Sequence, residues 1–200
     1  MFTRYEIALR PQIADLQGER LAESLRSKGI AGIDSVRIAR VYHIENLSTA
    51  KGEELHLERL GRELLADAVA EHFTVNLPIY SCPDCYGVIE VAKLAGVMDP
   101  VEQSVAKAVS DLGYLCGRVR TSTRYYIQGQ YDLHSVANAA KKLIANEVIE
   151  RVIVGGFSVW HEQTPPPYDF HVHEINILDA SDDELMRISR EGTLSLSLEE

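Results

Sequence analysis

Two cysteines form the most suggestive local motif of the sequence. Cys82 and Cys85 are separated by Pro-Asp, and two thiolates at this spacing can supply half of a tetrahedral zinc site. His171 and His173 are two residues apart on an expected strand, so their side chains point the same way and could supply the other half. The alternative is a proline turn with partly buried thiols. One such cysteine pair is weak evidence, so we expect no metal site. We also expect no redox role, because no helix is predicted to begin at Cys82.

Arginine side chains on the expected strands are the second group that could do chemistry. Arg118, Arg120 and Arg124 lie along one stretch, and Arg37 and Arg40 lie along another. If they converged they would form a phosphate site, for which we retain Arg37, Arg118 and Arg120 as candidates. The alternative, which we favour, is that these side chains face solvent or pair with acidic helices.

The sequence lacks the motifs of nucleotide-binding and nucleophilic enzymes. Gly155-Gly156 follows an expected strand, but it has neither the third glycine nor the Lys-Ser/Thr of a phosphate-binding loop. No Gly-x-Ser-x-Gly turn is present. We therefore expect no catalytic and no cofactor-binding residue in this chain. Four other histidines have no consistent partners in the sequence and are expected at the surface or at a rim: His43, His56, His72 and His134.

Composition and charge exclude several classes of protein. With 46% hydrophobic and 25% charged residues, the chain resembles an ordinary globular protein. Much of the net charge of −10 comes from residues 157–200, which hold 2 basic and 10 acidic side chains, so we expect no binding to nucleic acid. No apolar run approaches the ~18 residues of a membrane span, so no membrane is expected either. The odd number of cysteines, three, favours the reducing cytoplasm over a disulfide scaffold.

One stretch of the sequence occurs twice. Residues 64–75 read LLADAVAEHFTV and residues 143–154 read LIANEVIERVIV, an offset of 79. The offset between the two copies shrinks along the chain, and it changes only between expected elements. We therefore predict a true internal duplication with loop deletions. Upstream, the recurring residues keep their order at offsets of 84 and then 83: Glu6, Asp15, Leu25 and Gly29 recur as Glu90, Asp99, Val109 and Gly113, and Val36, Arg37, Tyr42 and Ile44 recur as Val119, Arg120, Tyr125 and Ile127.

Apolar periodicity predicts the same order of elements in both copies, namely strand, helix, strand, strand, helix, strand. Asp15 and Asp99 are the expected N-caps of the two first helices. The elements of the first copy are expected at about 2–9, 15–29, 34–38, 41–47, 55–71 and 73–80, and those of the second at about 88–94, 99–112, 118–121, 123–128, 133–146 and 149–154.

The predicted fold class is α+β. Residues 1–80 and 81–156 form two tandem ferredoxin-like repeats with a joint at 81–86. Residues 157–200 form a linker-like acidic tail with one strand and a short helix from about Ser181. A unit of about 75 residues buries about 60% of the surface that its unfolded chain exposes, whereas ~150 residues bury nearly 70%. We therefore expect the repeats, each with a four-stranded antiparallel sheet, to pack as a pseudo-two-fold dimer within one chain.

An ordered set of residues in the first copy carries a resemblance to a known family. These residues are Arg10-Pro11, Asp15, Gly18, Leu25, Gly29, Val36-Arg37-Ile38, Tyr42, Ile44-Glu45, Leu64-Leu65-Ala66, Val69 and Glu71. The copy resembles PurS, the small non-catalytic subunit of phosphoribosylformylglycinamidine synthase, and the resemblance implies a PurS-like fold. The second copy is a looser match, with no Arg-Pro and with Asn146 where Asp67 stands. A tandem PurS-like pair is similar to the N-terminal region of large, single-chain forms of this synthase.

The resemblance implies a non-catalytic scaffold role in de novo purine biosynthesis. In the family, the complex is a ligase that uses ATP, Mg and glutamine to convert formylglycinamide ribonucleotide to the amidine, and none of these is expected to bind this chain. The implied partners are the synthetase (PurL) and glutaminase (PurQ) parts of the same enzyme. The PurS-like part would bridge them and support ammonia transfer, either as a separate subunit or as the front of a longer chain.

Two other functions remain open from the residues alone. A tandem ferredoxin-like regulatory module would bind a small molecule between its repeats, and a thermal shift with amino acids or nucleotides would detect it. A ferredoxin-like hydrolase or isomerase would use arginine and histidine where the repeats meet. Turnover by this chain alone would support that alternative.

Overall fold

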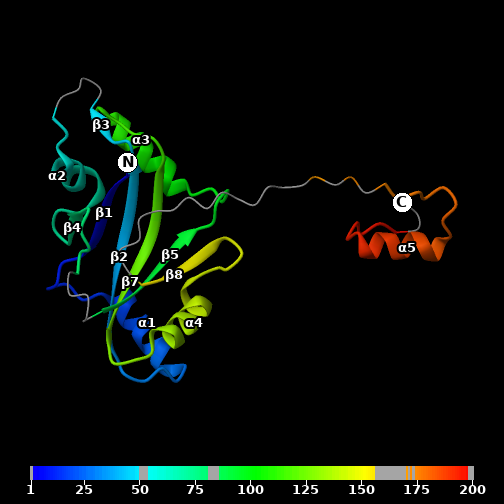
Figure 1. Cartoon of the computed structure of the whole chain (residues 1–200), viewed down its shortest axis with the longest axis horizontal. Coiled ribbons are helices and arrows are strands. Elements are labelled where there is room, and N and C mark those ends of the chain that lie inside the picture. The colour runs from blue at the N-terminus through cyan, green and yellow to red at the C-terminus, as the bar shows by residue number, and fades with distance from the viewer. Residues whose placement is uncertain are drawn as a thin grey trace. The chain divides into compact units, whose positions relative to one another are not determined.

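The computed structural model describes residues 2–49, 54–80, 86–155, 170, 172 and 174–197 (Figure 1). The chain divides into two units, Met1–Thr164 and Pro165–Glu200. The first unit contains the sheets, and the second contains helix α5 (Asp182–Glu191). The α+β class predicted from the sequence is confirmed. Within the described ranges, no helix is both long and apolar enough to cross a membrane.

A six-stranded antiparallel sheet forms the centre of the first unit. Its strand order is β4-β1-β2-β7-β5-β8, and β2 and β7 meet at the middle. A second sheet of two short strands, β3 (Ser48–Thr49) and β6 (Tyr114–Leu115), lies apart from it. The main strands are β1 (Phe2–Leu9), β2 (Ile33–Glu45), β4 (Glu71–Val75), β5 (Tyr86–Lys93), β7 (Val119–Gly129) and β8 (Glu150–Val154).

Two aspartates start the first helix of each half, as the sequence predicts. The Asp15 side chain accepts hydrogen bonds from the Gly18 N–H at 2.9 Å and the Ile38 N–H at 2.7 Å, so it both caps α1 and ties it to β2. Asp99 accepts from the Val101 N–H at 2.9 Å and caps α3. The helices of this unit are α1 (Leu16–Ser27), α2 (Leu57–Leu60), the π-helix η1 (Gly61–Leu65), α3 (Pro100–Asp111) and α4 (Leu133–Ile144).

The predicted division of each middle strand into two is wrong. The expected strands at 34–38 and 41–47 are one strand, β2, and those at 118–121 and 123–128 are one strand, β7. Residues 39–41 interrupt the local apolar pattern because Arg40 lies among apolar neighbours, but they pair continuously with residues 122–124 of β7. Each half therefore contributes three strands to one common sheet instead of building a four-stranded sheet of its own.

The second helix of the first half ends earlier than predicted. The sequence favoured a helix to Glu71, but η1 ends at Leu65 and Ala66 is extended, with φ −112° and ψ 139°. The Asp67 side chain accepts hydrogen bonds from the Val69 and Ala70 N–H groups, and these bonds stabilise a turn in place of the helix. The following strand, β4, therefore begins at Glu71 and ends at Val75, not at 73 and 80.

The second unit contains the predicted helix in the form of α5, which begins after Ser181. The strand expected near 170–178 is not seen, because the described residues of that stretch belong to no strand. The acidic first turn of the helix, Asp182 to Glu184, matches the capping pattern of the sequence.

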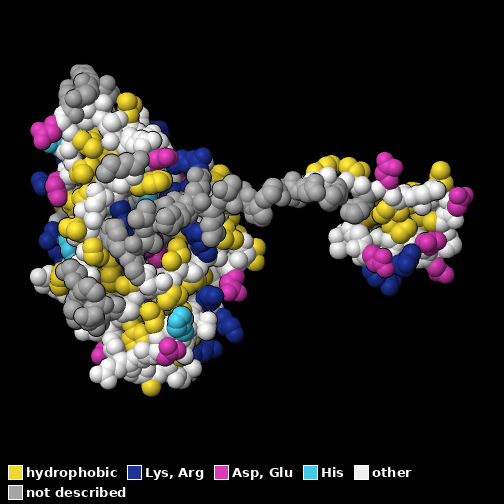
Figure 2. Space-filling model, in the orientation of Figure 1, with side chains coloured by type: hydrophobic (Ala, Val, Ile, Leu, Met, Phe, Trp, Pro, Cys, Tyr) yellow, Lys and Arg dark blue, Asp and Glu magenta, His cyan; other side chains and the backbone are white. Residues whose placement is uncertain are grey.

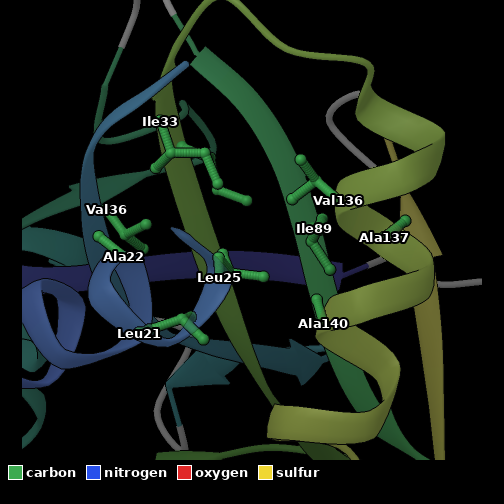
Figure 3. Packing of buried hydrophobic residues seen from close by; sticks show 10 residues of the cluster. Leu21, Ala22, Leu25, Ile33, Val36, Ile89, Val136, Ala137 and Ala140 are labelled. Carbon is green, nitrogen blue, oxygen red and sulfur yellow. The ribbon is translucent and has the colours of Figure 1, made fainter. Parts of the chain in front are cut away.

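The helices cover one face of the main sheet in two separate cores, and each core draws on both halves. Figure 1 shows α1 beside α4 at one end of the sheet and α2 near α3 at the other. The first core contains residues of α1 and α4, and the second contains residues of α2, η1 and α3. Neither half can therefore bury its own helices alone. Figure 3 shows the first core, with Leu21, Ala22 and Leu25 on α1 and Val136, Ala137 and Ala140 on α4.

Candidate functional site

The candidate zinc ligands Cys82, Cys85, His171 and His173 lie outside the described residues. Within the part of the chain that the structure does describe, no group of three or more His, Cys, Asp and Glu side chains is arranged to hold a metal ion. The zinc question therefore stays a prediction.

Arg37, a phosphate candidate, is engaged by the protein itself. Its Nη1 donates to the Ile13 carbonyl at 3.0 Å, and its Nη2 donates to the Leu9 and Arg10 carbonyls at 3.2 and 3.1 Å. Its Nε donates to the Tyr80 hydroxyl at 3.2 Å. These contacts fix the chain between β1 and α1.

The other two phosphate candidates do not join Arg37 at one site. The Arg120 Nη1 lies 2.5 Å from Glu102 Oε2, and Arg118 is exposed. In the β2–β7 ladder, Arg37 is paired with Tyr126 and Arg120 with His43. The two ladder positions are thus six residue pairs apart, which is about 20 Å at ~3.3 Å per residue.

The site that the structure does reveal lies on the other face of the sheet. Tyr5 and Ile7 point into a helical core, so Arg4 and Glu6, which alternate with them, point the opposite way. They meet charged and polar side chains from β2, β5 and β7, all at most 7% exposed. We call this set the charge cluster: Arg4, Glu6, His43, Glu90, Ser122, Arg124 and Tyr126.

Glu6 is surrounded by donors from both halves. Its Oε1 lies 2.5 Å from Arg4 Nη1 and 3.2 Å from Arg124 Nη1. Its Oε2 accepts hydrogen bonds from the Tyr126 hydroxyl and from the Ile79 N–H, the latter at 3.0 Å. Burial, followed by the charge of Glu6, raises the pKa of Tyr126, so this hydroxyl keeps its proton.

Glu90 occupies the same position in the second half, 84 residues after Glu6. The Ser122 hydroxyl donates to its Oε1 at 2.6 Å, and His43 Nε2 lies 3.9 Å from the same oxygen. Burial raises the pKa of Glu90, but the side chains of His43, Arg124, Ser122 and Arg4 together outweigh burial and lower the pKa to about 2. Glu90 is therefore a carboxylate despite being 1% exposed.

Arg124 joins the two carboxylates. Its Nε and Nη2 donate to Glu90 Oε2 at 3.0 and 2.7 Å, and its Nη1 reaches Glu6. Burial lowers the pKa of Arg124, but the two carboxylates raise it by more, so the guanidinium stays charged. The Arg124 guanidinium also lies 5.9 Å from the centre of the Tyr126 ring. One side chain thus connects β1 to β5 across the middle of the sheet.

Two residues of the cluster, Ser122 and Arg124, flank Thr123 on β7. Arg40 of β2 pairs with Thr123 of β7, and these two residues also correspond at the sequence offset of 83. Arg124 breaks the relation, because the equivalent residue of the first half is Val41. The cluster is therefore shared by both halves without being symmetric.

Sequence reasoning predicted His43 at the surface or at a rim, and this is wrong, because His43 is 2% exposed within the cluster. The signal that could have found the site was a glutamate at the centre of an apolar strand in both copies. Glu6 lies between Tyr5 and Ile7, and Glu90 lies between Ile89 and Val91. A buried carboxylate requires a cationic partner, which would have directed attention to Arg124.

The charge cluster holds β1, β2, β5 and β7 together. Its two carboxylates and two guanidinium groups balance, and their polar atoms are directed at one another instead of at solvent. Removing one partner from such a buried pair costs about 3–5 kcal/mol. The fold and the charge cluster define an α+β protein in which buried ion pairs hold the two halves of one sheet together.

The family of the first half follows from comparison with known proteins. Residues 3–78 match the family model PurS, described as phosphoribosylformylglycinamidine (FGAM) synthase. The expected resemblance is confirmed for this region, which spans β1 to β4 and is PurS-like. The match connects residues 3–78 to a family described as FGAM synthase. No curated protein matches the chain in sequence.

Proposed function

We propose that the chain is a non-catalytic scaffold of FGAM synthase, which bridges the synthetase (PurL) and glutaminase (PurQ) parts and supports the passage of ammonia between them. The observation that carries the proposal is the PurS match over residues 3–78. On this proposal ATP, Mg and glutamine are bound by the other parts of the enzyme, and the chain works in the cytoplasm.

The proposal includes a second PurS-like repeat at residues 81–156. In the first half β1 pairs with β2 and β4, and in the second half β5 pairs with β7 and β8 in the same arrangement. The turn before the edge strand is also repeated. Glu71 Oε2 accepts from the Asp67 N–H at 2.9 Å, and Glu150 Oε2 accepts from the Asn146 N–H at 2.9 Å.

A bridge for ammonia needs a rigid body that holds its partners in a fixed relation. The unbroken ladder from Ser35 to Ile44 on β2 and the buried ions of the charge cluster supply that rigidity. A sheet of six strands also gives an extended surface that can contact two partners at once. These features support a scaffold role, since they position neighbours without reacting with a substrate.

The test compares two nitrogen donors in the assembled synthase, with and without residues 1–156. Glutamine-dependent formation of the amidine should fall strongly without these residues, whereas activity with added ammonium should fall less, because free ammonia needs no bridge. Adding back the separately purified chain should restore the glutamine reaction. Equal loss with both donors would indicate a folding role for the partner, and unchanged activity with both would end the proposal.

A further inference from the structure

The second unit carries an apolar groove along α5. Hydrophobic side chains from the helix and from the segments on either side of it line a cavity of about 270 Å³. Figure 2 shows the hydrophobic side chains of this unit gathered together, with Asp and Glu side chains around them. The apolar residues of the lining are Ile177, Leu185, Met186, Ile188, Leu194 and Leu196.

One serine fixes the wall of the groove. Ser189, on α5, donates its hydroxyl to the Leu196 carbonyl at 3.0 Å and accepts from the Leu196 N–H at 2.9 Å. The Leu194 N–H donates to the Ser189 carbonyl at 2.9 Å. The chain after the helix is therefore held back against α5, with Leu194 and Leu196 along the groove.

The backbone of this wall is held in an unusual conformation. Thr193 and Ser195 have φ of 52° and 57°, the left-handed region that residues with a Cβ seldom adopt, and a β-branched threonine least of all. Such residues persist only where surrounding contacts fix them, and they gather at binding sites. Here they place Leu194 and Leu196 on the same side of the segment.

The groove is too open to be a core. Ser189 is the only buried residue among the described residues of the second unit. Ile177, Leu194 and Leu196 are 55%, 54% and 48% exposed although they line the cavity. A segment of this size seldom supports a core of its own. A contiguous apolar surface with a polar rim is typical of a protein-binding site.

Charge identifies the occupant. Residues 165–200 carry nine acidic and two basic side chains, and Asp182 lies in the wall of the groove itself. An acidic rim disfavours nucleic acid and an anionic membrane, and it disfavours a second copy of this acidic chain. It favours a protein segment with apolar side chains flanked by lysine or arginine.

We propose that the α5 groove docks an apolar, basic-flanked segment of a partner protein. This inference rests on the proposed function, under which the segment belongs to the synthetase part. The groove then holds the partner by apolar contacts, and the acidic rim selects it and speeds its approach.

The test measures binding of the full chain to the purified synthetase part by titration calorimetry. The double variant Leu194→Asp/Leu196→Asp should bind at least about tenfold more weakly, since both side chains lie at the centre of the apolar contact. The matched control is Leu115→Asp, because Leu115 is 52% exposed on β6 of the first unit. Asp182→Asn, which removes one rim charge, should weaken binding by a few-fold and make it less sensitive to salt.

The outcomes separate this inference from the proposed function. If the wild-type chain does not bind the synthetase part, both fail. If it binds and the double variant binds equally well, the groove is not the docking site, although the scaffold role stands. If the double variant lowers the melting temperature of the isolated chain by several degrees, the groove is filled within the chain, and this also overturns the inference. Circular dichroism of each variant checks that α5 remains folded.

Discussion

The two halves of the main sheet share their strands and turns but differ in the helix that covers them. In the second half α4 is a regular helix of 12 residues, whereas the first half has α2, of 4 residues, followed by the π-helix η1, of 5 residues. The two side chains that meet between the helix and the edge strand also differ in size between the halves. A Cβ on Gly61 would fall 2.3 Å from the Phe73 ring, while the equivalent residues, 79 positions later, are Ala140 and Val152.

The comparison shows which features of this fold can vary. A larger side chain on the edge strand is accommodated by a smaller one on the helix, so the space between helix and sheet stays filled. The helix backbone adapts, with a π turn where Gly61 meets the ring. The strand pairing does not change, because it is fixed by backbone hydrogen bonds.

The largest effect is expected at Arg124, the position where the halves differ inside the charge cluster. Arg124→Leu leaves Glu6 and Glu90 buried near the single cation of Arg4, so the free energy of unfolding should fall by about 3–5 kcal/mol. Urea unfolding measures this. Arg118→Leu, at an exposed position nearby on the chain, is the control and should change stability by no more than about 0.5 kcal/mol. A loss below about 1 kcal/mol for Arg124→Leu would show that the cluster does not clasp the halves.

Stability should also fall in acid because of Glu90. Its pKa is about 2 in the folded protein, below the ordinary value of 4.5, so its contribution is complete above pH ~4.5 and is lost as the pH falls towards 2. The contribution is about 3–4 kcal/mol by proton linkage. Unfolding free energies measured between pH 5 and pH 2.5 should fall more steeply for the wild type than for Glu90→Gln. Parallel curves would contradict this prediction.

The size match between the helix residue and the edge-strand residue can be tested by giving the first half the residue pair of the second half. Gly61→Ala should destabilise the protein by about 1–3 kcal/mol, because the new Cβ meets the Phe73 ring. Gly61→Ala/Phe73→Val recreates the Ala–Val pair of the second half and should recover much of the loss. A double-mutant cycle gives the coupling energy between the two sites, and additive effects would show that Gly61 and Phe73 are not matched in size.

The smallest effect is expected in the repeated turns, and it should differ between the halves. The Asp67 carboxylate accepts from the Val69 and Ala70 N–H groups at 2.9 and 2.7 Å, whereas the side-chain amide oxygen of Asn146 accepts from the Val148 N–H at 3.1 Å. Asp67→Ala should therefore lower the melting temperature more than Asn146→Ala, because it leaves more donors unsatisfied. Equal shifts would mean that the two turns contribute alike.

Much of the fold could be predicted because its signals are local. The Asp15 and Asp99 caps act within the first turns of their own helices. The alternation of apolar and polar residues around Ile7 indicates a strand with one buried face. The turn at Asp67 was misread as helix because the apolar pairs on either side of it continue the helical period. In that case a side chain that bonds to its own backbone prevailed over periodicity.

The charge cluster could not be predicted in the same way because its partners are far apart in the sequence. Glu6 and Arg124 are separated by 118 residues. Only the pairing of β2 with β7 brings them together, and that pairing depends on where the two halves meet. For the same reason the sequence could not decide whether Arg37 and Arg120 converge, and the ladder places them six residue pairs apart.

The sharing of both helical cores between the halves has a consequence for synthesis on the ribosome. The core of α2 and α3 needs Val109 and Val119, and the core of α1 and α4 needs Val136 and Ala140. At about 5–20 residues per second, translation from Val75 to Val119 takes roughly 2–9 s. During those seconds the first half lacks the residues that complete its cores, so its apolar side chains stay accessible to chaperones.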